Sequence, residues 1–235
     1  MAIVKAEAYG HGLEGVVKAL DGEDCAFFGV ATVAEACRVR DAGAKTCPFI
    51  LGPCFEGERE EIVQNGWRAA LSSMEEAEHF NSLGALYGKT VHVHLGVDTG
   101  MGRIGARDEN EVRAALAALA DAPLVRLTGA FTHFADADNP DDSFSRQQFA
   151  RFMRLTEMLP AGLTLHAAAS DASLRFPWAR LNMVREGIAI YGCPAADYGL
   201  HLRPAMQFET RVSYVKAVVP GDTVGYGRAF LADRP

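Results

Sequence analysis

The stretch VKAEAYGHG, residues 4–12, sets one lysine at the end of a short apolar run and follows it with a turn rich in glycine. A β-branched pair before Lys5 is typical of a buried strand, and Gly10 and Gly12 mark a turn. The pattern predicts a strand that delivers one amine to a loop. A lysine held there is partly desolvated, which favours the neutral amine that forms Schiff bases, whereas a lysine that reaches solvent is the alternative.

Composition and charge narrow the class of protein. The chain has 235 residues, of which 49% are hydrophobic, and a net charge of -7 without any run of Lys or Arg. These values predict a soluble globular protein that binds small molecules, with no nucleic acid or membrane as partner. The five cysteines lack CxxC spacing, and no apolar stretch approaches the roughly 20 residues of a membrane span. We therefore expect free thiols, no metal site and a cytoplasmic location.

Short apolar runs alternate with helical segments along the chain. The eight candidate strands are residues 3–6, 26–31, 48–52, 68–71, 90–95, 127–133, 163–168 and 183–191. Segments with helical periodicity include residues 33–41, 57–65, 74–83, 108–120 and 143–159. This order predicts a (β/α)8 TIM-type barrel, and a doubly wound open sheet is the competing architecture.

Polar and reactive residues follow the predicted strands, and this favours the barrel. They are Lys5, Arg103, His133, Ser170 and Arg185 with Gly187. In a barrel the carboxyl ends of all strands meet at one face, whereas an open sheet would spread several of them apart. We therefore expect these side chains to form one site.

The pattern changes after the eighth predicted strand. Residues 192–202 are rich in Gly and Pro and resemble a linker rather than the helix that should follow. Beyond them, alternating apolar residues and a PGD turn predict antiparallel strands. We expect a barrel over residues 1–195, then a linker and the incomplete start of a β-domain over residues 196–235.

Each candidate site residue has an ordinary alternative role. Tyr9 can reach an anion near Lys5, and Arg103 in DTGMGRIG can meet an oxyanion or phenolate, although a surface salt bridge would also explain it. His133 and His166 can be site residues or satisfied core histidines. Ser170, at the start of SDASLR, suits an anion site or a simple helix cap.

The strongest local signal is VREGIAIYG, residues 184–192. Arg185 precedes Gly187, and the amides of Gly187 and Ile188 can approach a phosphate closely. An amine, two arginines, two histidines and a phosphate cradle at one barrel mouth suit a phosphorylated aldehyde cofactor.

Six motifs in order give the chain a family resemblance: VKAEAYGHG, HLGVDTGMGRIG, FTHFADAD, SDASLRFP, LNMVREGIAIYG and VGYGRAF. The sequence resembles the alanine racemase family, pyridoxal 5'-phosphate enzymes with an N-terminal (β/α)8 barrel and a C-terminal β-domain. The resemblance implies interconversion of L-alanine and D-alanine for cell-wall synthesis, a homodimer, and catalysis by two bases.

The resemblance also implies a role for each matching residue. Lys5 would hold the cofactor as a Schiff base and act as one base, and Arg103 would contact the cofactor phenolate and the substrate carboxylate. Arg185 would face the pyridine nitrogen and, because arginine holds its proton tightly, would not give that nitrogen a full proton. The other residues it implies are Tyr9, Ser170, Gly187 and Ile188 at the phosphate, and His133 and His166 in a chain linking Arg185 to the second base.

Some features depart from the family pattern. The family's second base is a C-terminal tyrosine, and its first strand and helix precede the lysine strand, so we interpret the chain as a fragment truncated at both ends. Gly96 stands where many members carry a carbamylated lysine, and Asp171 stands where a small neutral residue is expected. The alternatives are a barrel that binds the cofactor without turnover, a racemase of serine or broader specificity, and, less favoured, a diamino-acid decarboxylase.

Overall fold

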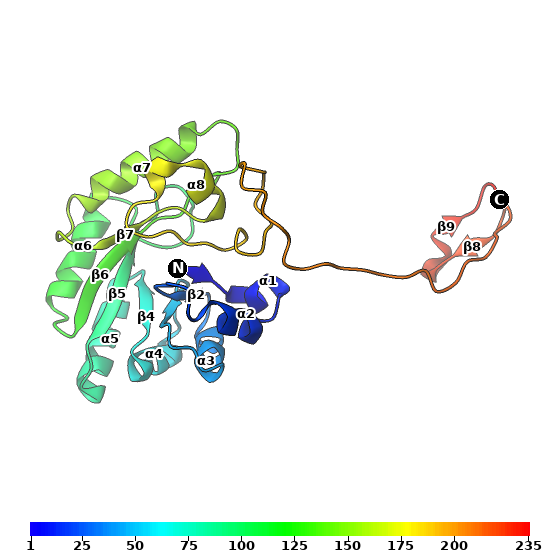
Figure 1. Ribbon diagram of the computed structural model, residues 1–235. Helices are drawn as coiled ribbons and strands as arrows, with labels where there is room; N and C mark the ends of the chain where they lie inside the picture. Colours follow the sequence, from blue (N-terminus) through cyan, green and yellow to red (C-terminus); the bar gives the residue numbers. More distant parts are fainter. The chain divides into compact units, whose positions relative to one another are not determined.

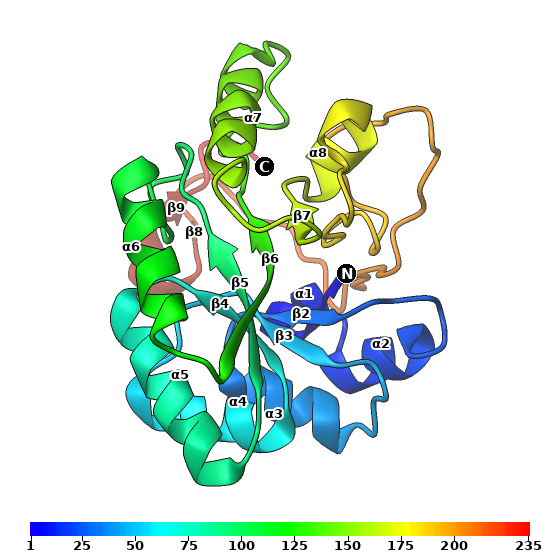
Figure 2. The same cartoon turned by 90° about the vertical axis from the view of Figure 1, so that its left-hand side faces the viewer.

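A computed structural model describes residues 1–235, which form two units, Met1–Ala205 and Met206–Pro235. The first unit contains a curled sheet of seven parallel strands in sequence order, with helices on its outer side (Figures 1 and 2). The strands are β1 (Ala2–Ile3), β2 (Phe28–Val30), β3 (Pro48–Ile50), β4 (Arg68–Leu71), β5 (Val91–Gly96), β6 (Val125–Phe131) and β7 (Thr164–His166). The predicted TIM-type arrangement is confirmed, and the open doubly wound sheet is excluded because sequential strands are neighbours throughout.

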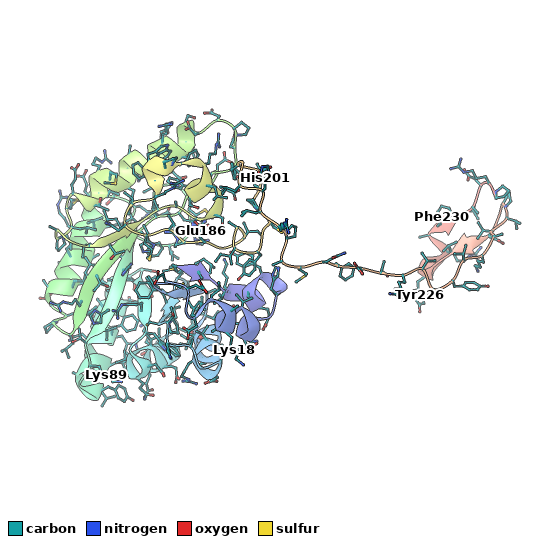
Figure 3. The ribbon with its side chains drawn as sticks, in the orientation of Figure 1. Lys18, Lys89, Glu186, His201, Tyr226 and Phe230 are labelled. Atoms are coloured by element: carbon teal, nitrogen blue, oxygen red, sulfur yellow. The ribbon has the colours of Figure 1, made fainter.

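The eighth predicted strand, residues 183–191, is wrong as a continuous strand. Its place is taken by two isolated parallel bridges, which join Arg185 to Ala169 and Glu186 to Ala2. The Ile3 amide donates to the Glu186 carbonyl at 2.8 Å, so this short segment lies between β7 and β1. The strand cannot continue because residues 187–192 form tight turns that hydrogen-bond within themselves. In Figure 3, Glu186 lies among the strands, whereas Lys18 and Lys89 lie at the surface.

The helices lie between consecutive strands, as the repeat predicts. They are α2 (Leu13–Leu20), α3 (Val33–Asp41), α4 (Arg59–Asn65), α5 (Met74–Tyr87), α6 (Glu109–Ala120), α7 (Ser143–Thr156) and α8 (Ser170–Arg175). Both α3 and α5 begin with a capping box, in which the first-turn glutamate and the cap hydroxyl satisfy each other's backbone amides. No helix is both long and apolar enough to span a bilayer.

The strands are apolar because the sheet is covered on both faces. Side chains such as Phe28, Val30, Ile50 and Val93 are completely buried, and so is Phe49, which precedes Ile50 in β3. Burial on both sides explains the nearly continuous apolar runs of the sequence. The polar exceptions to this rule, described below, therefore need their own partners.

The second unit contains one antiparallel pair, β8 (Thr223–Val224) with β9 (Phe230–Leu231). Tyr226 and Phe230 belong to this hairpin (Figure 3). The alternating pattern predicted strands from about residue 202 onward, but residues 206–219 have no regular secondary structure. The antiparallel prediction is thus confirmed at the PGD turn and the residues after it.

Candidate active site

Lys5 begins a turn of left-handed helix, α1 (Lys5–Gly10), rather than ending a strand. The four residues after it, Ala6 to Tyr9, all have φ between 50° and 57°. Only β1, Ala2–Ile3, is extended, so the predicted strand over residues 3–6 is too long. Left-handed helix costs roughly 1–2 kcal/mol per non-glycine residue, so contacts elsewhere must hold this turn.

The strain predicts a stabilising substitution. Ala6 is exposed, and replacing it with glycine removes the Cβ that opposes a positive φ, so Ala6→Gly should raise the free energy of unfolding by about 1 kcal/mol. Ala117→Gly, on the exposed face of right-handed α6, should lower it by about 1 kcal/mol. Urea denaturation of both variants checks the contrast; equal losses would show that residue 6 is right-handed in solution.

A stack of three aromatic rings holds the far end of the turn. The Tyr191 ring lies against Tyr9, with centroids 5.3 Å apart, and against His11, at 4.4 Å and nearly parallel. The Tyr191 hydroxyl donates to the Ile3 carbonyl at 3.0 Å, and burial raises its pKa. Sequence reasoning gave neither Tyr191 nor His11 a role; both lie in motifs that it quoted.

Ser170 and Gly187 form a cradle beside this turn. The Ser170 hydroxyl accepts the backbone amides of Gly187 at 3.0 Å and Ala189 at 3.2 Å, so these amides point at one spot. A Cβ on Gly187 would lie 2.7 Å from the Tyr9 hydroxyl, and only glycine avoids that clash. The structure thus brings Tyr9, Ser170 and Gly187 together, as predicted. Ala189, which was not predicted, joins them, whereas the Ile188 amide donates no hydrogen bond within the chain.

Arg185 is buried beneath the cradle with only neutral partners. It is 3% exposed, and its guanidinium donates to the carbonyls of Thr132 at 2.7 Å, Ala167 at 2.9 Å and His166 at 3.0 Å. It also reaches one nitrogen each of His166 at 2.9 Å and His133 at 3.2 Å. Burial, and then the charge of Arg103, lowers the pKa of Arg185 to about 9, so it stays a cation at neutral pH.

The contacts of Arg185 fix which nitrogen of each histidine carries the proton. Arginine can only donate, so Nδ1 of His166 is the acceptor and its proton is on Nε2. That proton is donated to Nδ1 of His94 at 2.8 Å. The structure therefore extends the predicted pair of histidines into a relay from Arg185 through His166 to His94, a residue that sequence reasoning missed.

The three histidines are neutral for a physical reason. Burial lowers the pKa of His94 to about 4 and holds that of His166 well below its usual value. Burial, and then the cations Arg185, Arg103 and Lys5, lowers the pKa of His133 to about 3. Three positive charges therefore oppose the protonation of His133, in addition to its burial.

The loop that carries Arg103 is organised by one carboxylate. Asp98 accepts the amides of Gly100 at 2.9 Å, Gly102 at 3.0 Å and Arg103 at 3.0 Å. Burial opposes ionisation of Asp98, but these amides hold its pKa below the usual value. The Arg103 side chain is exposed and makes no hydrogen bond within the chain, so it can bind a ligand anion.

Two positions that depart from the family pattern have clear surroundings. A Cβ on Gly96 would lie 3.3 Å from the Gly105 backbone, so a side chain there requires the Arg103 loop to shift slightly. Asp171 accepts the Ala195 amide at 2.9 Å and the Tyr198 hydroxyl at 3.0 Å. The carboxylate of Asp171 therefore binds the segment at residues 195–198. This accounts for the acidic residue at position 171, which the sequence alone did not explain.

The comparisons with known proteins agree with this fold. Residues 1–194 match the family model of the alanine racemase N-terminal domain. The chain is 36% identical to alanine racemase 2 of Caldanaerobacter subterraneus subsp. tengcongensis, over all of this chain and 62% of that protein. The chain thus spans less than two thirds of the length of this relative.

Solved structures give the same result. An alanine racemase of Clostridium difficile superposes with a TM-score of 0.89 at 31% identity, over 98% of this chain and 62% of that one. A histidine racemase from Leuconostoc mesenteroides superposes with a TM-score of 0.86 at 29% identity, over 100% of this chain and 64% of that one. From the match to its N-terminal domain and from these relatives, the chain belongs to the alanine racemase family.

Proposed function

We propose that this chain is the cofactor-binding barrel of a pyridoxal 5'-phosphate-dependent racemase that interconverts L-alanine and D-alanine in the cytoplasm, for cell-wall synthesis. The observation that supports it best is the grouping of the Lys5 turn, the cradle at Ser170 and Gly187, and Arg185 without a carboxylate partner. We infer that residues 1–195 bind the cofactor and that residues 196–235 are a linker and the start of a β-domain.

The residues at the cradle fit a phosphate group. A cluster of backbone amides and a hydroxyl can bind an anion, and here the amides of Gly187 and Ala189 donate to the Ser170 hydroxyl while the Ile188 amide donates to no group of the chain. The Tyr9 hydroxyl lies directly over Gly187, and the amide of Ile188 lies between the two converging amides in sequence. We infer that Tyr9, Ser170, Gly187, Ile188 and Ala189 hold the phosphate, while Lys5 binds the aldehyde carbon.

Arg185 fits the nitrogen end of the cofactor ring. When bound, pyridoxal phosphate withdraws electrons from the α-carbon of an amino acid and makes its proton acidic. Arg185 keeps its proton at neutral pH and receives no help from a carboxylate, so it offers a hydrogen bond without transferring a full proton. This limits the electron withdrawal and favours simple proton transfer over side reactions.

Racemisation requires one base on each face of the α-carbon. We infer that Lys5 serves one face, and that a tyrosine from the second domain of a partner subunit serves the other, in a homodimer. Arg103 would bind the substrate carboxylate with its free guanidinium, and His133 and His166 hold Arg185 in place. The neutral state of His133 suits this, because a second charge beside Arg185 would repel it.

Two other functions are compatible with the same site. A barrel that binds the cofactor without turnover would need Lys5 and the cradle but no second base. A racemase of another amino acid is supported by the likeness to the Leuconostoc histidine racemase, whose TM-score is 0.86.

The test has two parts on one preparation. The chain is incubated with pyridoxal 5'-phosphate, reduced with borohydride and digested, and the modified lysine is found by peptide mass. A second aliquot of the loaded chain is left unreduced and incubated with L-alanine in D2O, and deuterium at the α-carbon is measured in each enantiomer. Lys5→Arg should abolish the adduct, whereas Lys18→Arg, a change at an exposed lysine of α2, should not.

The outcomes separate the hypotheses. An adduct at Lys5 with deuterium in both enantiomers supports the alanine racemase. Deuterium in L-alanine only, or none, supports the barrel without turnover, and the same assay with L-histidine or L-serine tests the wider specificity. No adduct at Lys5 contradicts the proposed cofactor.

A further inference from the structure

Glu35 binds backbone amides from two separate segments. Its Oε2 accepts the amides of Ala31 at 2.8 Å and Thr32 at 3.2 Å, which completes the cap of α3. Its Oε1 accepts the amide of Ala6 at 2.7 Å. One carboxylate therefore ties the start of α3 to the Lys5 turn.

The amide of Ala6 belongs to the peptide bond that follows Lys5. Fixing this peptide plane fixes ψ of Lys5, and with it the direction in which the lysine side chain leaves the backbone. Arg38, three residues after Glu35 and on the same side of α3, binds the Glu7 carboxylate in the next position of the turn. Helix α3 therefore contacts the strained turn at two successive residues.

A second glutamate with the same local role shows that the Ala6 contact is a separate feature. Glu76 caps α5 in the same way, by accepting the amides of Ser72 at 2.6 Å and Ser73 at 3.2 Å. Its other oxygen lies 3.8 Å from the Arg59 guanidinium and binds no amide of another segment. A capping box therefore does not by itself produce a contact like that between Glu35 and Ala6.

We propose that Glu35 is a positioning residue for Lys5, and that its carboxylate holds the Ala6 amide so that the lysine amine meets the cofactor aldehyde. The inference rests on the proposed function, because it assumes that Lys5 binds pyridoxal phosphate. Glu35 does not touch the cofactor in this proposal, and it acts on Lys5 through the hydrogen bond with the Ala6 amide.

The experiment compares Glu35→Ala and Glu35→Gln with Glu76→Ala. Two quantities are measured: the pyridoxal 5'-phosphate concentration that gives half-maximal borohydride adduct at Lys5, and the hydrogen exchange rate of the Ala6 amide in the unloaded chain. Glu35→Ala should raise that concentration at least about tenfold and speed the exchange. Glu35→Gln keeps one uncharged acceptor, so it should fall between Glu35→Ala and the unchanged chain.

Glu76→Ala is the matched control, because it removes an equivalent cap far from Lys5. It should lower thermal stability without changing either quantity. Glu35 variants that match Glu76→Ala in both readouts would overturn the proposal and leave Glu35 as a helix cap only. If the unchanged chain forms no adduct, the proposed cofactor fails, and the exchange of Ala6 then decides whether Glu35 holds the turn.

Discussion

Replacing Gly129 with alanine is expected to cost the barrel about 3 kcal/mol or more, because the new methyl group has nowhere to go. A Cβ at this position of β6 would lie 2.4 Å from Cε1 and 2.5 Å from Nδ1 of His94, and 2.5 Å from the Thr164 carbonyl oxygen. Gly129 pairs with His94 on one side and with Thr164 on the other. The clash is therefore expected to disrupt both the His94–His166 hydrogen bond and the pairing of β6 with β7.

The matched control is Gly15→Ala in α2, where an added Cβ meets nothing within 4 Å. Glycine is a poor helix former, so this substitution should raise stability by about 1 kcal/mol. Urea denaturation with fluorescence detection measures both. A Gly129→Ala chain as stable as the unchanged chain would mean that His94 leaves its position at little cost, and the relay from Arg185 would then lose its last member.

The strand and helix order was predictable because each signal is local. Apolar runs such as residues 48–50 and 91–95 form strands that are buried on both sides. Helices α3 and α5 each begin with a capping box that is recognisable in the sequence. The eighth strand was overestimated because VREGIAIY is mostly apolar apart from Arg185 and Glu186, whereas its backbone turns from Gly187 onward, where Gly187 also lies close to Tyr9. That contact joins residues far apart in the sequence.

The left-handed turn could not be derived from residue preferences. Ala6, Glu7 and Ala8 favour right-handed helix. Only tertiary contacts, including the hydrogen bond of Glu35 with the Ala6 amide, stabilise the left-handed conformation. The one visible signal was the spacing of Gly10 and Gly12, which correctly indicated a turn without giving its form.

The candidate site was predictable where a motif carries the residue and not where a neighbour defines it. Lys5, Arg103 and Arg185 stand out because charged residues beside apolar runs or within glycine-rich turns need a reason. His94 looks like one of two histidines in the alternating run VHVHLG, and a shift of the β5–β6 register between Val93 and His94 places it opposite Gly129. Its role follows only once Gly129 is known to lie opposite.

The buried histidines predict a loss of stability in mild acid. His94 and His133 have folded-state pKa values of about 4 and about 3, and that of His166 is also well below the ordinary 6.5. Below pH 6.5 the histidines therefore bind protons in the unfolded chain but not in the folded chain. The stability that the neutral histidines contribute is present above that pH and is lost as the pH falls toward 4. Between pH 7 and pH 5, linkage gives a loss of about 2 kcal/mol for His94 and for His133, and His166 adds to it in the same direction.

Burial also lowers the pKa of His92 and of the Met1 amine, so these two groups add to the loss as the pH falls, whereas other groups act outside this window or against it. Asp98 has a lowered pKa and matters only below its ordinary value of 3.8, while burial raises the pKa of Glu186, so that residue offsets part of the loss as the pH falls. Urea denaturation at a series of pH values measures the slope. His166→Gln should make it shallower by the share of one histidine, whereas His201→Gln, at an exposed position, should leave it unchanged.

A slope that is flat between pH 7 and pH 5 would mean that the histidines accept protons inside the folded barrel. Arg185 argues against this, because its guanidinium donates to Nδ1 of both His133 and His166 and leaves neither nitrogen free to take a proton. Protonation must break these hydrogen bonds and set a second cation beside a buried arginine. The acid sensitivity of the chain therefore reports how strongly burial, together with Arg185 at His133 and His166, keeps these histidines neutral.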